Sequence, residues 1–295
     1  MAARALGLDA ELRRVAAGKN DARELRLNGR ETSSLIVTFT LDTDVARIAE
    51  YSALIARNAH TQTHGAYVAL GRGESDLILV AREPSVEEIR FFEQQKIALD
   101  IRPVALDALV FIVNADNAIN ALSLQQLRDI YTQKTRKWNE VGGRREEIHA
   151  ITRDRNSGSE ELMRELVMEN RPVIEGGDRF VIHSMIGTLD AVESDENSLA
   201  YAVYYYERVM HPRATIKALA VEGVLPSRQT IADRTYPLVE PVYIVTRKNI
   251  APDGPTAILR DWLLSNEGQK LVAKSGYVPI RADGLGAVRR VPTWF

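Results

Sequence analysis

Short apolar runs alternate along the chain with segments whose apolar residues recur at helical spacing. Residues 77–80 and 104–113 are apolar runs bounded by polar residues, a pattern typical of strands buried on both faces. Residues 86–92 and 124–130 carry apolar side chains three or four positions apart, each behind a serine-led capping box. Strand, polar loop and helix in this order form the unit that builds parallel sheets. The pattern therefore predicts an α/β protein.

The first sixty residues are less regular. Residues 1–25 mix Ala, Arg and Glu with scattered Leu, which predicts a loosely amphipathic helix or a frayed terminus. A short strand is expected at 24–27, and residues 35–39 alternate in the manner of another strand. A capped helix is expected from about residue 44 to residue 55, because its apolar residues share one face.

The second half of the chain continues the alternation. Residues 199–206 are apolar and tyrosine-rich, and are predicted to be part strand and part helix. A strand around Pro241 is expected at an edge or a crossover, since proline cannot donate to a sheet ladder. Helices are expected to begin near Pro255 and Ser265, and Gly276 is expected to end the second of them.

Composition narrows the classes of function. A chain of 295 residues favours two domains, and 38 Lys plus Arg against 40 Asp plus Glu leave no broad cationic face for nucleic acid. The absence of cysteine excludes disulfides, thiolate metal sites and a cysteine nucleophile. No apolar run approaches the roughly 20 residues that a membrane span needs. Residues 1–12 lack the pattern of a signal peptide, so we expect a cytoplasmic chain or one whose leader was removed.

A polar loop that enters a helix is the strongest candidate for chemistry. Arg153-Asp-Arg-Asn-Ser-Gly-Ser159 precedes apolar residues at helical spacing, so the loop ends at a helix N-terminus. Such a terminus offers unpaired N–H groups and a partial positive charge to an anion. Ser157 and Ser159 would add hydroxyl donors, Gly158 would allow close approach, and Arg153 would supply a charged fork.

A ligand-free alternative exists for the same loop. Ser157 and Glu160 form a Ser-x-x-Glu capping box, which would satisfy the same N–H groups internally. A phosphoryl-transfer enzyme is the competing class of function, because it would use similar anion contacts. The chain, however, has no Walker loop and no Gly-x-Ser-x-Gly elbow, and only His60 and His64 approach a metal-ligand spacing. We therefore predict no enzyme, no metal ion and no cofactor.

Several strings, taken together and in order, resemble the PstS-type phosphate-binding proteins of phosphate ABC importers. The resemblance extends from about Thr63 to Ile280. It is carried by residues 63–67, 76–80, 107–114, 124–131, 137–143, 153–159, 202–206, 236–238, 262–269 and 276–279.

The resemblance implies a type II periplasmic-binding-protein fold, with two α/β lobes joined by two crossing strands and a ligand cleft between them. Residues 1–106 and 240–295 would form lobe 1, and residues 107–239 would form lobe 2. The crossings are expected near 103–110 and 236–242, with hinge closure on the ligand. The anion would be bound dry, by neutral donors from both lobes and an arginine.

Residue by residue, the resemblance implies anion contacts from Arg153, Ser157, Gly158 and Ser159. Thr32, Ser33 and Ser34 stand near the place of the family's first anion loop, although a solvated loop is the alternative. Arg82 could face the cleft or pair with Glu83 or Glu87 on the surface. Ser184, Gly187 and Thr188 could face the anion or merely start a helix. Glu31, Glu83 or Asp154 could accept a hydrogen bond from hydrogen phosphate if one of them points into the cleft.

The expected function is therefore that of an extracytoplasmic solute-binding protein, its signal sequence absent from this chain. It would capture inorganic phosphate as a monomer and deliver it to an ABC transporter permease, without binding nucleic acid. Binding of another oxyanion, such as sulfate or molybdate, is one alternative. A signalling or surface module that kept the fold and lost the ligand is another.

Overall fold

The structure is a computed structural model, and it describes residues 9–15, 22–28, 34–40, 62–154, 157–169, 171 and 181–280. The chain divides into two compact units, Met1–His60 and Thr61–Phe295. In the first unit, β1 (Asp9–Val15), β2 (Ala22–Asn28) and β3 (Ser34–Thr40) form an antiparallel sheet in that order.

The strands expected at 24–27 and 35–39 are confirmed as parts of β2 and β3. The helix predicted over 1–25 is wrong where the structure describes it, because residues 9–15 pair as a strand with β2. Pairing along all seven residues of β1 outweighs a weak local preference for helix. The helix expected at 44–55 lies outside the described residues.

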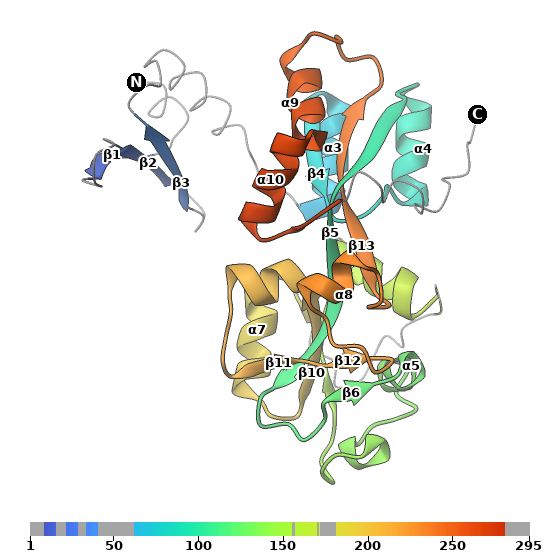
Figure 1. The fold of residues 1–295 in the computed structure, drawn as a ribbon. Helices are drawn as coiled ribbons and strands as arrows, with labels where there is room; N and C mark the ends of the chain where they lie inside the picture. The colour runs from blue at the N-terminus through green and yellow to red at the C-terminus, as the bar shows by residue number, and fades with distance from the viewer. Residues whose placement is uncertain are drawn as a thin grey trace. The chain divides into compact units, whose positions relative to one another are not determined.

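The second unit is built around one long strand, β5 (Leu99–Asn114), which runs through both of its lobes (Figure 1). Among the described residues, a seven-stranded sheet follows the path β4–β13–β5–β10–β7, and β11 and β14 also pair with β5. The bounds of its other strands are β4 Leu77–Val80, β7 His149–Ala150, β10 Ser198–Val203, β11 Ile216–Ala218, β13 Val239–Arg247 and β14 Val278–Pro279.

The expected parallel arrangement is wrong for most of this sheet. Only the β10–β7 pair is parallel, whereas β5 pairs antiparallel with β10, β11, β13 and β14, and β4 pairs antiparallel with β13. Between β4 and β5 the cause is β13, a strand from late in the chain that is inserted between them. Local strand-loop-helix order does not reveal such a long-range insertion.

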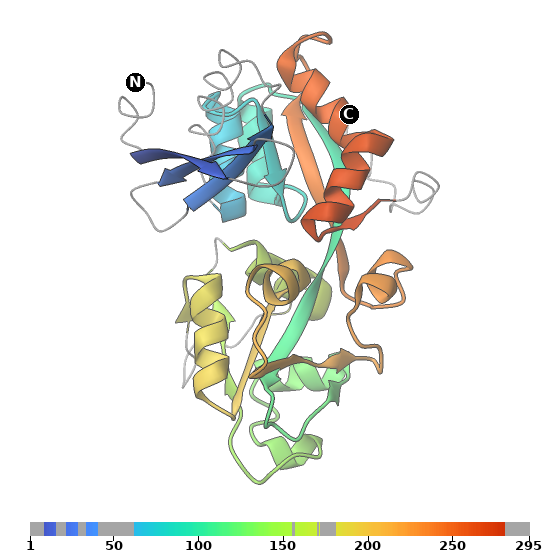
Figure 2. The same cartoon turned by 60° about the vertical axis from the view of Figure 1, so that its left-hand side comes forward.

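One lobe, which we call the β4 lobe, places helices on both faces of β4, β13 and the first half of β5 (Figure 2). Tyr243 and Val245 pack with α3 (Gln62–Arg72) and α4 (Val86–Gln94). Val242 and Ile244 pack in a separate cluster with Val272 of α10 (Asn266–Ser275), which follows α9 (Pro255–Leu264). Successive residues of β13 thus serve opposite faces, as the two-residue period of a strand requires.

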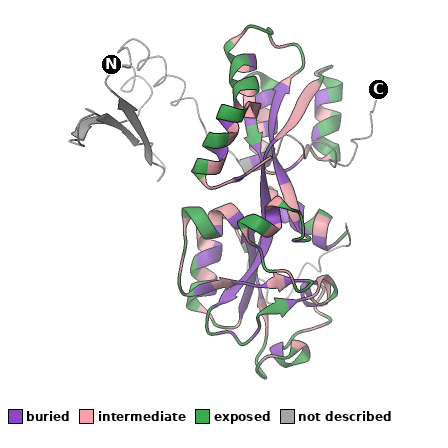
Figure 3. Cartoon of the chain, viewed as in Figure 1, coloured by how far each residue is buried: buried purple, intermediate pink, exposed green. Residues whose placement is uncertain are grey.

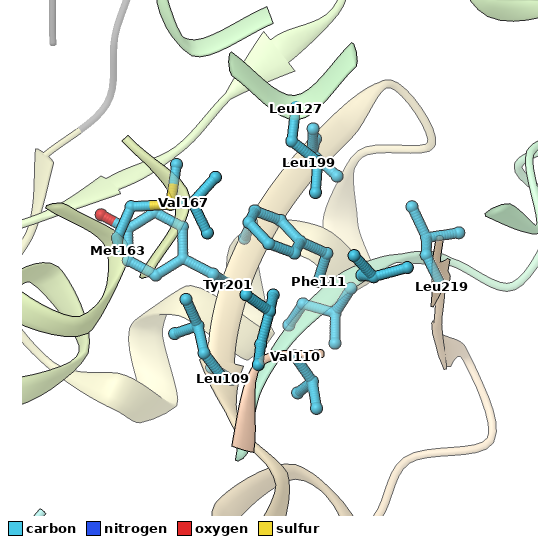
Figure 4. Packing of buried hydrophobic residues seen from close by; sticks show 14 of the residues in the cluster. Leu109, Val110, Phe111, Leu127, Met163, Val167, Leu199, Tyr201 and Leu219 are labelled. Atoms are coloured by element: carbon cyan, nitrogen blue, oxygen red, sulfur yellow. The ribbon is translucent and has the colours of Figure 1, made fainter. Parts of the chain in front are cut away.

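The other lobe, which we call the β10 lobe, packs around the second half of β5. Residues 109–113 are fully buried and contact Leu127, Met163, Val167, Leu199 and Tyr201 in one core (Figures 3 and 4). The elements of this lobe are β6 (Ala121–Leu122), α5 (Leu124–Tyr131), η1 (Trp138–Val141), β8 (Thr152–Arg153), α6 (Gly158–Leu162), η2 (Met163–Val167), β9 (Val181–Ile182), α7 (Met185–Ser194), η3 (Tyr206–Met210), β12 (Ala220–Val221) and α8 (Arg228–Ala232).

The lobes are connected by β5 and by the start of β13, as the resemblance implies. Pro241 lies opposite Leu106 on β5, while β4 pairs with β13 only from Tyr243 onward. The missing N–H of Pro241 therefore falls at the crossover, as predicted, where β4 does not pair with the strand. The boundaries of the lobes in sequence, including the assignment of residues 1–106, stay a prediction.

Local sequence rules account for most helix ends. The capping boxes at Ser85 and Ser123 are present, Pro255 is the first residue of α9, and Gly276 ends α10 with a φ of 107°. The prediction that β4 is buried on both faces is wrong, because Leu79 is 56% exposed. In the part of the chain that the structure describes, no helix is long and apolar enough to cross a membrane.

Candidate functional site

The N-terminus of α6 carries two N–H donors for which the described residues provide no acceptor. Ser157 is the N-cap residue, and its Oγ accepts the N–H of Glu160 at 3.2 Å and lies 3.0 Å from Oγ of Ser159. The N–H groups of Gly158 and Ser159, the first two residues of the helix, have no acceptor among the described residues. A buried, unsatisfied N–H costs free energy. The helix start is therefore ready to donate to an anion.

The ligand-free capping box is only half formed. Ser157 caps Glu160, but the carboxylate of Glu160 does not reach back to the N–H of Ser157, which donates to the carbonyl of Asp154 at 3.0 Å. Instead the Glu160 carboxylate accepts the hydroxyl of Tyr201 and, at 3.3 Å, the N–H of Arg153. Within the described part of the chain, the carboxylate of Glu160 thus does not cover the start of the helix. The internal alternative fails because Tyr201, distant in sequence, competes for the carboxylate.

Arg153 brings a buried positive charge beside this helix start. Its side chain is held by β8, which pairs with β9, and one Nη donates to the carbonyl of Ile182 at 3.1 Å. Burial lowers the pKa of Arg153, against the raising effect of the carboxylates of Asp154 and Glu160. Its Nε is buried and has no hydrogen-bond partner among the described residues. The guanidinium therefore retains a free donor for an additional acceptor.

The β4 lobe meets α6 at the same point. A Cβ added to Gly158 would lie 2.6 Å from Oγ1 of Thr63, at the start of α3, and 3.8 Å from Cβ of Ala81. Thr63 is buried, so its hydroxyl faces the mouth of α6 and not solvent. Sequence reasoning missed Thr63 as a site residue. Its position just inside a helix start, within the matching string 63–67, was the available signal.

Arg82 follows β4 and is buried, so the alternative of a surface pair with Glu83 or Glu87 is wrong. Its two Nη atoms bind the carboxylate of Glu88 at 2.7 and 3.0 Å, in a fork that is also contacted by His64. Burial acts to lower the pKa of Arg82, but Glu88 more than offsets burial, and the pKa is raised. Among the described residues, Nε of Arg82 has no partner.

Two further segments with predicted site residues are 31–34 and 184–188. Thr32, Ser33 and Glu31 lie outside the described residues, and Ser34 is the first residue of β3, with its side chain also outside them. Ser184 caps α7 by accepting the N–H of Gly187, and Thr188 is fully buried with its hydroxyl donating to the carbonyl of Ser184. The structure therefore gives Ser184, Gly187 and Thr188 the role of a helix start.

The arrangement suits a small oxyanion held by neutral donors and one or two guanidinium groups. Hydroxyls of Ser157, Ser159 and Thr63 and two helix N–H groups come together where water access is low. Buried neutral donors of this kind satisfy the oxygens of an anion by hydrogen bonding, so a positively charged group is not needed for each oxygen. The described residues include no group of three His, Asp or Glu side chains placed to hold a metal ion.

Comparison with known proteins identifies a family that matches most of the chain. A sequence profile described as "PBP superfamily domain" matches residues 20–267. Protein SphX of Synechococcus elongatus is 26% identical over 238 residues, which cover 76% of this chain and 69% of that protein. The phosphate-binding protein PstS of Staphylococcus saprophyticus is 27% identical over 199 residues, covering 65% of this chain and 60% of that protein. The chain thus spans 60–69% of the length of these two relatives.

A solved structure extends the comparison to the fold. The crystal structure of a Clostridium perfringens protein with bound phosphate matches this chain with a TM-score of 0.63, at 23% identity. The match covers 75% of this chain and 85% of that chain. At this identity the likeness concerns the fold alone.

Proposed function

The chain belongs to the PBP superfamily, and from this premise we propose that it is a PstS-like solute-binding protein that captures inorganic phosphate between its β4 and β10 lobes. The observation that carries the proposal is the start of α6, where the first two N–H groups have no acceptor among the described residues, beside buried Arg153 and facing Thr63 of the other lobe. Two similarities support phosphate as the ligand: the Staphylococcus saprophyticus relative is a phosphate-binding protein, and the Clostridium perfringens structure contains bound phosphate.

Each site residue has a proposed role. Arg153 supplies the charged donor, Gly158 and Ser159 supply backbone N–H groups, and Ser157 and Ser159 supply hydroxyls. Thr63 closes the site from the β4 lobe. Arg82 is a secondary candidate, since Glu88 already neutralises its charge and only Nε is free among the described residues. Thr32, Ser33 and Ser34 stay candidates on the basis of the resemblance.

The biological setting is proposed from the family. The protein acts outside the cytoplasm, as a monomer, and passes phosphate to an ABC transporter permease. We propose a binder and not an enzyme, because among the described residues no histidine or carboxylate accepts a hydrogen bond from the hydroxyls of the site to activate them, and no group is placed to hold a metal ion.

Calorimetric titration with phosphate, sulfate and molybdate tests this function. We expect wild type to bind phosphate far more tightly than the other two anions. Arg153→Ala should weaken phosphate binding by about 3 kcal/mol, or over a hundredfold, because a buried charged hydrogen bond is lost. Arg144→Ala is the matched control, since Arg144 pairs with Glu196 on the exterior of the β10 lobe. Equal affinities for the three anions, or an Arg153→Ala variant that binds like Arg144→Ala, would reject the assignment.

A further inference from the structure

The hydroxyl of Tyr201 joins the two ends of the segment that carries the proposed site. Tyr201 belongs to β10, outside this segment, and its hydroxyl accepts the N–H of Arg153 at 2.9 Å and donates to Oε2 of Glu160. The same N–H of Arg153 also donates to Oε2 of Glu160, at 3.3 Å. Arg153 and Glu160 are thus held together at one phenol group, and residues 157–159 lie between them in the sequence.

The ring that carries this hydroxyl is fixed by packing. Tyr201 is fully buried and lies opposite Phe111 in the register of β10 and β5. Its ring meets those of Phe111 and Tyr131 edge to face, with centroids 6.1 and 5.7 Å apart, and its hydroxyl is directed away from Phe111 (Figure 4). Burial raises the pKa of Tyr201 well above its usual value of 10, so the phenol keeps its proton and stays a donor.

Glu160 is the group that this hydroxyl restrains. It is the third residue of α6 and is buried, and a carboxylate in the first turn of a helix is attracted to the N–H groups there. For the N–H groups of Gly158 and Ser159 the described residues provide no acceptor, and these are the donors that phosphate would use. A carboxylate bound to them would exclude a second anion and repel its charge.

We propose that Tyr201 is a positioning residue for anion binding, whose hydroxyl holds the carboxylate of Glu160 away from the start of α6. The proposal rests on the proposed function, because it concerns the donors of the same site. It assigns to Tyr201 no contact with the anion. Without the hydroxyl, the carboxylate of Glu160 would turn to the N–H groups of Gly158 and Ser159 and compete with phosphate for them.

The test removes the hydroxyl and keeps the ring. Tyr201→Phe is compared with Tyr236→Phe, a matched control, because Tyr236 is also buried in the core of the β10 lobe and its hydroxyl donates to the carbonyl of Leu109 at 3.0 Å. In calorimetric titration with inorganic phosphate, Tyr201→Phe should bind about tenfold more weakly than wild type or worse, and Tyr236→Phe within about twofold of wild type. Denaturant unfolding of both variants measures what each hydroxyl contributes to stability.

A merely structural role of Tyr201 is distinguished by repeating the substitution without its partner. In Glu160→Ala there is no carboxylate to restrain, so adding Tyr201→Phe should weaken phosphate binding by less than about threefold. Glu160→Ala alone should bind phosphate at least as tightly as wild type, because the carboxylate donates nothing to the anion. This single variant also decides the question if Tyr201→Phe does not fold.

Three results would overturn the positioning role and leave the proposed function intact. Tyr201→Phe could bind phosphate as Tyr236→Phe does, or lose the same affinity with and without Glu160. Glu160→Ala alone could lose about tenfold in affinity, which would show that the carboxylate serves the anion directly. Failure of wild type to bind phosphate would overturn both proposals.

Discussion

At the scale of single residues, the site depends on where Glu160 directs its carboxylate. Sequence alone places Ser157 three residues before Glu160 and so predicts both a capping box and an anion site without deciding between them. The decision comes from Tyr201, whose hydroxyl binds Glu160 from β10. A contact across 41 residues of sequence cannot be derived from local spacing. Arg153 and residues 157–159, which the sequence indicated, therefore lie together in the structure. Whether their donors are available to an anion depends on a tertiary contact, that of Tyr201 with Glu160.

Gly158 provides the first prediction at this scale. Gly158→Ala would place a methyl group 2.6 Å from Oγ1 of Thr63, which is too close for two unbonded atoms. The helix itself should tolerate alanine, so the free energy of unfolding without ligand should change by less than about 1 kcal/mol. Phosphate affinity should fall at least tenfold, because the methyl group prevents the two lobes from approaching.

Denaturant unfolding and calorimetry on Gly158→Ala measure these two effects separately. A variant that binds phosphate as wild type does would show that Thr63 and Gly158 do not meet in the bound state.

Asp107 provides the second prediction. It accepts the N–H groups of Ala108 and Tyr205 at 2.8 and 3.0 Å, and its burial raises the pKa to about 7. The folded state therefore binds more protons than the unfolded state between the ordinary pKa of 3.8 and about 7. Stability is lost as pH rises through this interval, because the charged form must then be buried.

Asp107→Asn keeps an acceptor oxygen for both N–H groups and removes the charge. It should raise the free energy of unfolding by roughly 4 kcal/mol at pH 8.5 and by only about 1 kcal/mol at pH 4.5. Urea unfolding at the two pH values gives the comparison. An equal change in the free energy of unfolding at the two pH values would mean that the pKa of Asp107 does not differ between the folded and unfolded states.

At the scale of elements, helix ends illustrate what sequence can predict. Capping boxes at Ser85 and Ser123, the start of α9 and the glycine end of α10 follow from residues within one turn of each other, and all are present. The direction and burial of β4 were predicted wrongly, because they depend on β13, a strand from late in the chain whose Tyr243 lies opposite Val80 of β4. Local sequence predicts where helices begin and end, but it does not predict which strands pair in a sheet.

Two N-cap serines give a matched pair for the third prediction. Ser123 caps α5 and Ser157 caps α6, each accepting the N–H of the third helical residue. Alanine at either position should cost about 1 kcal/mol of stability. Only Ser157→Ala should also weaken phosphate binding, because Ser157 lies at the proposed site. For both variants, calorimetry measures the phosphate affinity and denaturant unfolding measures the free energy of unfolding. Equal loss of phosphate affinity in Ser123→Ala would assign the effect to general destabilisation.

At the scale of the whole molecule, β5 and β13 organise the second unit. Both lobes pack against β5, and the proposed site lies where α3 of one lobe meets α6 of the other. The order of matching strings predicted this family and fold from sequence. Thr63 and the pairing of Arg82 with Glu88 could not be predicted in the same way, because each depends on how the chain returns to the sheet.

Ligand binding should therefore stabilise the fold as a whole. Phosphate at a hundred times its Kd should add about 2.7 kcal/mol to the free energy of unfolding, because it binds only the folded state. Thermal unfolding should show a rise in Tm that grows with phosphate concentration in wild type and Arg144→Ala. Arg153→Ala should show almost none. An equal rise in Tm with sulfate would point to a general salt effect.

The most direct test of the central claim follows the backbone amides of Gly158 and Ser159 by NMR, in selectively labelled protein titrated with phosphate. Both signals should shift together, saturate at one phosphate per chain, and stay unmoved in Arg153→Ala. Phosphate that binds one to one by calorimetry while these two amides remain unchanged would contradict the account, since the anion would then lie elsewhere.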